Sequence, residues 1–131
     1  MADTRTPLAR ARGLGAARGG VHHWWMQRLT AIAIVPLTVW FVAGLVSLSG
    51  APWAAVVAWL GQPVRAALAV AFLALTFHHG QLGMQVLIED YVHHEGWKLG
   101  SLIAIKLLAA LLALLAILAV LRMALSGGAP T

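Results

Sequence analysis

Three long apolar runs, separated by two more polar stretches, dominate this chain and cover roughly residues 30–48, 65–88 and 99–121. Crossing the hydrocarbon core of a bilayer, about 30 Å thick, takes about 20 helical residues. Backbone polar groups in such runs must be satisfied without water, and the short alternating segments of a β-barrel are absent. The pattern therefore predicts an all-α membrane protein with three transmembrane helices.

The predicted organisation is a single three-helix transmembrane domain, residues 21–125, between a flexible basic N-terminal tail (1–20) and a C-terminal tail (126–131). The helices are expected at about residues 24–48, 64–92 and 97–124. The N-terminal tail contains four arginines, one acid and no apolar core, which excludes a secretory signal peptide. Three helices enclose little interior, so we expect a partner chain that completes a larger helical bundle.

Composition supports the membrane assignment and excludes other classes. Of 131 residues, 61% are hydrophobic and 10% charged, with a mean hydropathy of +0.85, outside the range of soluble domains. The formal net charge of +5 does not indicate nucleic-acid binding, because no basic and aromatic surface accompanies it. The chain has no cysteine, which excludes thiolate-bound metals and iron–sulfur clusters within it.

Basic residues are distributed unevenly between the two predicted sides of the membrane. Those at the N-terminal side are Arg5, Arg10, Arg12, Arg18, Arg28 and Lys98, and those at the opposite side are Arg65 and Arg122. By the positive-inside rule the N-terminus lies in the cytoplasm. The Ala, Arg and Gly bias of the tail is typical of a GC-rich bacterial genome and favours the bacterial inner membrane over a mitochondrial transit peptide. Lys106, inside the third span, is expected to extend its ammonium group toward the headgroups.

An ionisable side chain near the middle of the second span is the strongest candidate for function. His79 lies roughly 16 Å from Asp90 and roughly 21 Å from Arg65 along the helix. At that depth a histidine is a functional candidate, and the alternative is a neutral imidazole bridging two helices. A proton relay or a copper or zinc site would need further groups nearby, whereas axial ligation of haem needs one neutral imidazole on each side of the iron.

Helical periodicity does not choose between the adjacent histidines. Gly80 and Gly83 leave the helix surface bare beside His79, which gives room for a porphyrin or a close helix. His78 belongs to a second polar stripe with Gln85 and Glu89. The bare surface is compatible with haem, but it does not decide whether His78 or His79 is the ligand.

The cytoplasmic end of the second helix carries a second candidate site. Asp90 and Tyr91 are expected at the membrane surface, where a tyrosine hydroxyl and a neighbouring carboxyl group can serve a quinone head group as hydrogen-bond donor and proton source. The alternative is a solvated helix end with a tyrosine anchor. Arg28 is predicted at the same level, where it can bind carboxylates such as haem propionates or set the topology.

Two segments together resemble the small hydrophobic membrane anchor subunit of succinate dehydrogenase, respiratory Complex II. HGQLGMQVLIEDYV, residues 79–92, resembles the haem and quinone helix of that family, and GVHHWWMQRLTA, residues 20–31, resembles its N-terminal signature. The resemblance covers nearly the whole chain apart from the tail. The chain departs from the motif in its doubled histidines, and the spacing to Gly83 and Met84 favours His79 over His78.

The resemblance implies that His79 is an axial ligand of a haem b shared with a partner anchor, the cytochrome b subunit of succinate dehydrogenase. It also implies that Tyr91 hydrogen-bonds ubiquinone with Asp90 beside it, and that Arg28 and His22 face the haem propionate region. The chain would then anchor the flavoprotein and iron–sulfur subunits to the lipid bilayer and would carry no succinate chemistry of its own. Alternatives are the cytochrome b subunit itself, a fumarate reductase anchor, or a small proton-coupled transporter component.

Overall fold

The computed structural model describes residues 6–8 and 18–126, and every regular element within residues 18–126 is a helix. Three of them are long: α2 (Arg18–Ser47), α4 (Pro63–Tyr91) and α5 (Glu95–Ser126). Each is long and apolar enough to cross a membrane. The three long apolar helices predicted from the hydrophobic pattern are therefore confirmed, and each is a candidate membrane span. Most of the predicted N-terminal tail, and the C-terminal tail after Ser126, lie outside the described residues.

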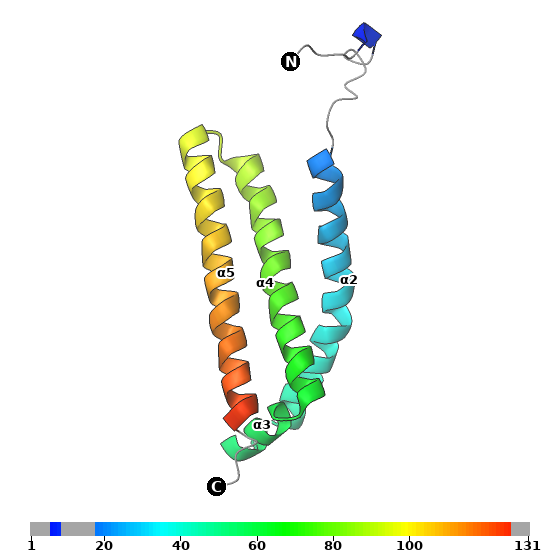
Figure 1. Cartoon of the computed structure of the whole chain (residues 1–131), viewed down its shortest axis with the longest axis vertical. Coiled ribbons are helices and arrows are strands. Elements are labelled where there is room, and N and C mark those ends of the chain that lie inside the picture. The colour runs from blue at the N-terminus through cyan, green and yellow to red at the C-terminus, as the bar shows by residue number, and fades with distance from the viewer. Residues whose placement is uncertain (1–5, 9–17, 127–131) are drawn as a thin grey trace.

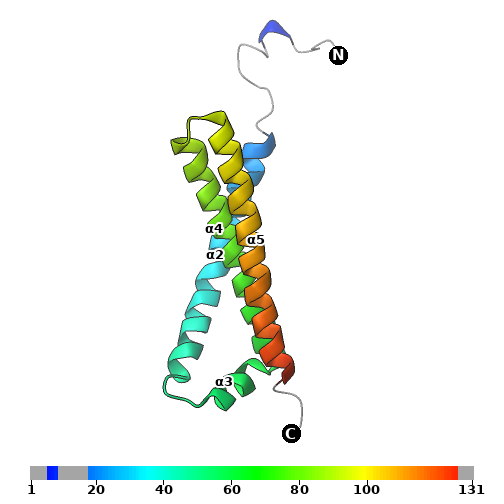
Figure 2. The same ribbon diagram turned by 90° about the vertical axis from the view of Figure 1, so that its left-hand side faces the viewer.

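The hydrophobic pattern did not predict a short helix, α3 (Trp53–Leu60), which follows α2 and precedes α4 in the chain. It lies across the end of the bundle at which α2 ends and α4 begins (Figures 1 and 2). Its eight residues are too few to span a bilayer, so the pattern presented them as part of a loop. Pro52 precedes the helix in an extended conformation, and the turn from α2 uses Gly50 at a φ of +77°, a backbone conformation that favours glycine.

The three long helices form a row in which α4 lies between α2 and α5 (Figure 1). Within the described part of the chain, α4 contacts both neighbours, whereas α2 and α5 do not contact each other. A row encloses little volume, and few side chains are buried. The outer faces must therefore be covered by lipid or by protein.

The densest packing lies at the α3 end. Leu60, Ala69 and Val120 form the buried cluster, and Ala69 is 0% exposed. Around them pack Trp40, Val56, Trp59, Val70, Leu73 and Met123. Trp59 stacks on Trp40, with ring centroids 5.4 Å apart. Its ring adds to the small core rather than standing free at the membrane surface.

At the opposite end, the turn between α4 and α5 brings the polar ends of the two helices together. α4 stops at Tyr91, and Val92 takes an extended conformation while its N–H still donates to the Ile88 carbonyl at 3.0 Å. Lys98, in the first turns of α5, donates from Nζ to the Glu89 carbonyl at 3.0 Å. This bond joins the start of α5 to the last turn of α4.

Candidate functional site

His79 and Thr30, which lie 49 positions apart in the sequence, meet at the interface of α2 and α4. Nδ1 of His79 is 2.8 Å from Oγ1 of Thr30. Thr30 is 3% exposed and is the one buried polar residue in the described part of the chain. His79 lies well inside α4, roughly 24 Å from Pro63 and roughly 18 Å from Tyr91 at about 1.5 Å per residue. The hydrogen bond therefore joins the two helices deep within a predicted span.

The hydroxyl of Thr30 also contacts two backbone carbonyls of its own helix. Oγ1 lies 2.7 Å from the carbonyl oxygen of Met26 and 3.1 Å from that of Gln27, and both carbonyls can only accept. The single hydroxyl proton therefore points to the backbone, as is common for threonine in helices. With that proton on the backbone, Oγ1 is able to accept from Nδ1–H of His79, in the tautomer that carries its lone pair on Nε2.

The neighbouring histidine faces a different helix. His78 is exposed and lines a groove of about 220 Å³ between α4 and α5, which Gln81 and Lys106 also line. Of the two adjacent histidines, only His79 has its ring held by a buried side chain. Periodicity alone could not distinguish the two histidines. They differ in the structure because α2 packs against His79 and not against His78.

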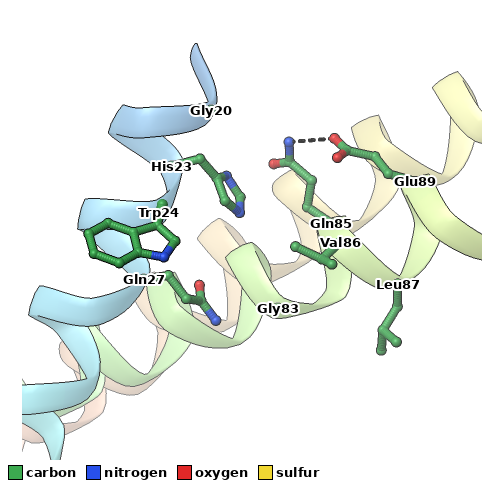
Figure 3. A pocket seen from close by; sticks show the side chains of 9 residues that line it. All are labelled: Gly20, His23, Trp24, Gln27, Gly83, Gln85, Val86, Leu87 and Glu89. Atoms are coloured by element: carbon green, nitrogen blue, oxygen red, sulfur yellow. Dashed lines mark hydrogen bonds between the residues drawn. The ribbon is translucent and has the colours of Figure 1, made fainter. Parts of the chain in front are cut away.

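A groove of about 700 Å³, lined by both polar and apolar residues, opens between α2 and α4, toward the end that carries the α4–α5 turn (Figure 3). Its lining residues are Gly20, His23, Trp24 and Gln27 from α2, and Gly83, Gln85, Val86, Leu87 and Glu89 from α4. Nε2 of His23 and Oε1 of Gln27 are buried without a hydrogen-bond partner. Because unpaired buried polar atoms are costly, the groove is suited to a polar ligand or a polar partner side chain.

The α4 wall of the groove contains a glycine and part of a series of side-chain hydrogen bonds that runs along α4. A Cβ on Gly83 would lie 3.8 Å from Nε2 of Gln27, so α2 packs close to the bare surface of α4 at this level. On the α4 side, Gln81 donates to Gln85 at 3.3 Å and Gln85 donates to Glu89 at 2.8 Å. The series follows the polar stripe seen in the sequence and adds Gln81 to it.

The other predicted site residues are exposed near the same end of the bundle. Tyr91 is 76% exposed and Asp90 is also exposed, and neither lines the groove. The guanidinium of Arg28 lies over the ring of Trp24, with Cζ 4.6 Å from the ring centroid. His22 is exposed. Among the described contacts, none joins these four predicted residues to one another.

Three polar residues of α2 were not assigned a role from the sequence: His23, Gln27 and Thr30. They recur at intervals of four and three positions and so share one helix face, which packs against α4. The sequence did contain a signal for this face, because its polar side chains recur at helical spacing at the start of an apolar run. The partner of that face, however, becomes visible only when α2 and α4 are placed together.

A metal site built from this chain alone is not supported, since the described residues include no group of three His, Cys, Asp or Glu side chains able to hold an ion. The arrangement at His79 does suit a haem. One imidazole is fixed through Nδ1, and its Nε2 makes no hydrogen bond within the described structure. Metal-binding histidines commonly have one ring nitrogen held by a protein acceptor in this way.

Comparison with known proteins identifies the family of this chain. The family model described as "Succinate dehydrogenase/Fumarate reductase transmembrane subunit" matches residues 2–121, which is most of the chain. The chain belongs to this family. Its curated relatives are named as hydrophobic membrane anchor subunits of succinate dehydrogenase, so the resemblance found in the sequence is confirmed.

Three relatives illustrate the extent of the similarity. The Rickettsia bellii protein is 30% identical over 109 residues, covering 83% of this chain and 87% of the relative. The Paracoccus denitrificans protein is 30% identical over 86 residues, covering 66% and 67%. The succinate dehydrogenase membrane anchor subunit of Reclinomonas americana is 30% identical over 107 residues, covering 70% and 79%. No solved structure gives a significant match to this anchor subunit.

Proposed function

We propose that this anchor subunit supplies His79 as one axial ligand of a haem b and forms part of the site at which ubiquinone is reduced. In the same proposal it attaches the flavoprotein and iron–sulfur subunits to the cytoplasmic face of the bacterial inner membrane. The observation that carries the proposal is the His79 imidazole, held deep in α4 by the contact of its Nδ1 with Thr30, so that its other ring nitrogen, Nε2, is the one available to iron.

The second axial ligand is proposed to come from the cytochrome b subunit. His22 and His23 are in the first turns of α2, roughly 10 Å along the helix axis from Thr30, which is the level of His79. Both are thus too far from His79 to complete a bis-histidine site in this chain, and His93 and His94 lie beyond the end of α4. When bound, the haem supplies a centre that accepts and donates one electron at a time.

The quinone part of the proposal rests on the end of α4. Tyr91 is the one tyrosine of the chain, and its hydroxyl can donate to a quinone carbonyl at the membrane surface. Asp90 stands beside it in the sequence as a proton source. Both residues precede the α4–α5 turn, which by the positive-inside rule faces the cytoplasm, the side on which we place the soluble subunits.

Arg28 and His22 are proposed to serve the haem propionate region. Both lie in the first half of α2 and are exposed, so they are accessible to groups bound outside this chain. The stacking of Arg28 on Trp24 holds the guanidinium near this end of α2. A guanidinium is well suited to a carboxylate because it can donate two parallel hydrogen bonds.

The ligand assignment is tested by the reduced-minus-oxidised visible spectrum of the purified complex, for the unmodified protein, His79→Ala and His78→Ala. His78→Ala is the matched control, since it removes an adjacent imidazole that faces α5. We expect loss of the haem b bands in His79→Ala and their retention in His78→Ala. Absence of the bands in the unmodified complex, or their retention in His79→Ala, would contradict the proposal.

The quinone assignment is tested with Tyr91→Phe, which removes only the hydroxyl. We expect lower succinate:ubiquinone turnover, with the complex still assembled and succinate oxidation by a soluble electron acceptor unchanged. Trp97→Phe serves as the control, because Trp97 is an exposed aromatic residue at the same end of the bundle. Normal ubiquinone turnover in Tyr91→Phe would refute a role for the hydroxyl.

A further inference from the structure

Thr30 has a feature that helix packing alone does not require. A threonine in a transmembrane helix satisfies its hydroxyl by bonding to the carbonyl four residues earlier, and Thr38 does this with Ile34 at 2.8 Å. Thr30 makes the same bond to Met26, and its Oγ1 also lies 2.8 Å from Nδ1 of His79. It thus uses its donor on the backbone and offers its acceptor to the histidine.

We infer that Thr30 is a positioning residue for haem, whose hydroxyl oxygen holds His79 in the Nδ1–H tautomer and fixes the ring plane so that Nε2 presents its lone pair to the iron. The inference rests on the proposed ligation of haem by His79. It assigns to α2 a direct part in a site whose ligand is on α4.

Two physical consequences follow from the hydrogen bond. In the apolar span no water competes for Nδ1–H, and the described structure offers it no acceptor other than Oγ1. Without that acceptor, either tautomer becomes possible and the ring is free to rotate. An accepted Nδ1–H also makes the imidazole more basic, which favours the more highly charged ferric iron over the ferrous form.

A competing explanation is that the bond only joins α2 to α4. Such a structural bond would affect assembly or thermal stability, but not the electronic properties of the iron once haem is bound. The midpoint potential of the haem and the low-spin electron paramagnetic resonance signal separate the two explanations, because both respond to the orientation and basicity of the axial imidazole.

The test uses Thr30→Val, which preserves shape and removes the hydroxyl, and Thr30→Ser, which restores it. Thr38→Val is the matched control, since it removes a hydroxyl bonded to the backbone alone. In the purified complex we expect Thr30→Val to hold haem roughly 10- to 100-fold more weakly, the usual effect of losing such a partner. We expect its midpoint potential to rise, by about 59 mV for each tenfold preferential loss of ferric haem.

Thr30→Ser should return the potential and the resonance signal toward those of the unmodified complex, and Thr38→Val should leave both unchanged. The inference is overturned if Thr30→Val has the unmodified potential and signal, or if Thr38→Val shifts them equally. Retention of haem in His79→Ala is a different outcome, because it refutes the ligand itself and hence the proposed function.

A second measurement keeps the inference testable if Thr30→Val does not assemble. The full chain, labelled with ¹⁵N-histidine and reconstituted in bilayers without haem, can be studied by solid-state NMR, with the His79 resonances identified by their loss in His79→Ala. The inference requires a protonated Nδ1 and an unprotonated Nε2 for this residue. The opposite tautomer would overturn it whatever the variants do.

Discussion

The contact between Gly44 and Trp59 makes a single added methyl group a sharp test of the packing at the α3 end. A Cβ on Gly44 would lie 2.5 Å from Cζ2 and 2.8 Å from Cη2 of the Trp59 ring. Carbon atoms pack favourably at about 3.5–4.0 Å, so the ring or the helix must move by about 1 Å. The ring cannot move freely, because it stacks on Trp40 and Arg65 lies 5.3 Å from its centroid.

We therefore expect Gly44→Ala to destabilise the subunit by about 1–3 kcal/mol, the usual cost of overpacking a well-packed region. The measurement is the thermal unfolding midpoint of the purified complex in detergent, with the fraction of this subunit retained in the complex as the signal. Gly100→Ala is the matched control, since a Cβ on Gly100 meets no atom within 4 Å.

A double-mutant cycle with Trp59→Leu identifies the cause of the loss. Leucine removes the ring edge that the new methyl group meets, so Gly44→Ala should cost far less in that background. The difference between the two costs is the coupling energy, which for residues in contact is about 0.5–3 kcal/mol. Additive effects, or equal losses from Gly44→Ala and Gly100→Ala, would refute the steric explanation.

Three further predictions follow from the packing. Ala69→Leu, at a fully buried position, should lower the unfolding midpoint or prevent assembly, whereas Ala104→Leu on an exposed face should do neither. Gly83→Ala should be tolerated, because its Cβ would lie 3.8 Å from Gln27, but Gly83→Ile should separate α2 from α4 and lower the haem content measured by visible spectroscopy. Lys98→Met should cost at most about 1 kcal/mol, and should speed hydrogen exchange in the α4–α5 turn because the bond to the Glu89 carbonyl is lost.

The long helices could be predicted from the sequence because a membrane span leaves a strong local signal. Continuous apolar runs located α2, α4 and α5 to within a few residues, except that α2 begins at Arg18 rather than near Trp24. α3 was missed for a physical reason. Eight apolar residues are too short for a span, and the helix owes its place to the packing of Trp59 and Leu60 against other elements. A local hydrophobic pattern does not predict tertiary contacts of this kind.

In the candidate site, too, the features that depend on local sequence could be predicted, and the contacts between helices could not. The depth of His79 in its span follows from counting residues, and its spacing to Gly83 supported its choice over His78. Neither observation could show that its Nδ1 lies 2.8 Å from Oγ1 of Thr30, because that partner is 49 positions away on another helix. The groove was also missed, since it depends on how α2 faces α4 rather than on either helix alone.

The groove between α2 and α4 and the outer face of α5 differ enough in chemistry to predict where the proposed partner, the cytochrome b subunit, binds. The groove between α2 and α4 contains unpaired buried atoms of His23 and Gln27, whereas the outer face of α5 is almost wholly apolar. Lipid tails cannot satisfy polar atoms, so we expect the cytochrome b subunit at the groove and lipid on α5. A photo-crosslinking side chain at Val86, which lines the groove, should capture the cytochrome b subunit in the assembled complex, while one at Leu114 on α5 should capture lipid. Capture of that subunit from Leu114 alone would mean that apolar packing, rather than the unpaired polar atoms, selects the interface.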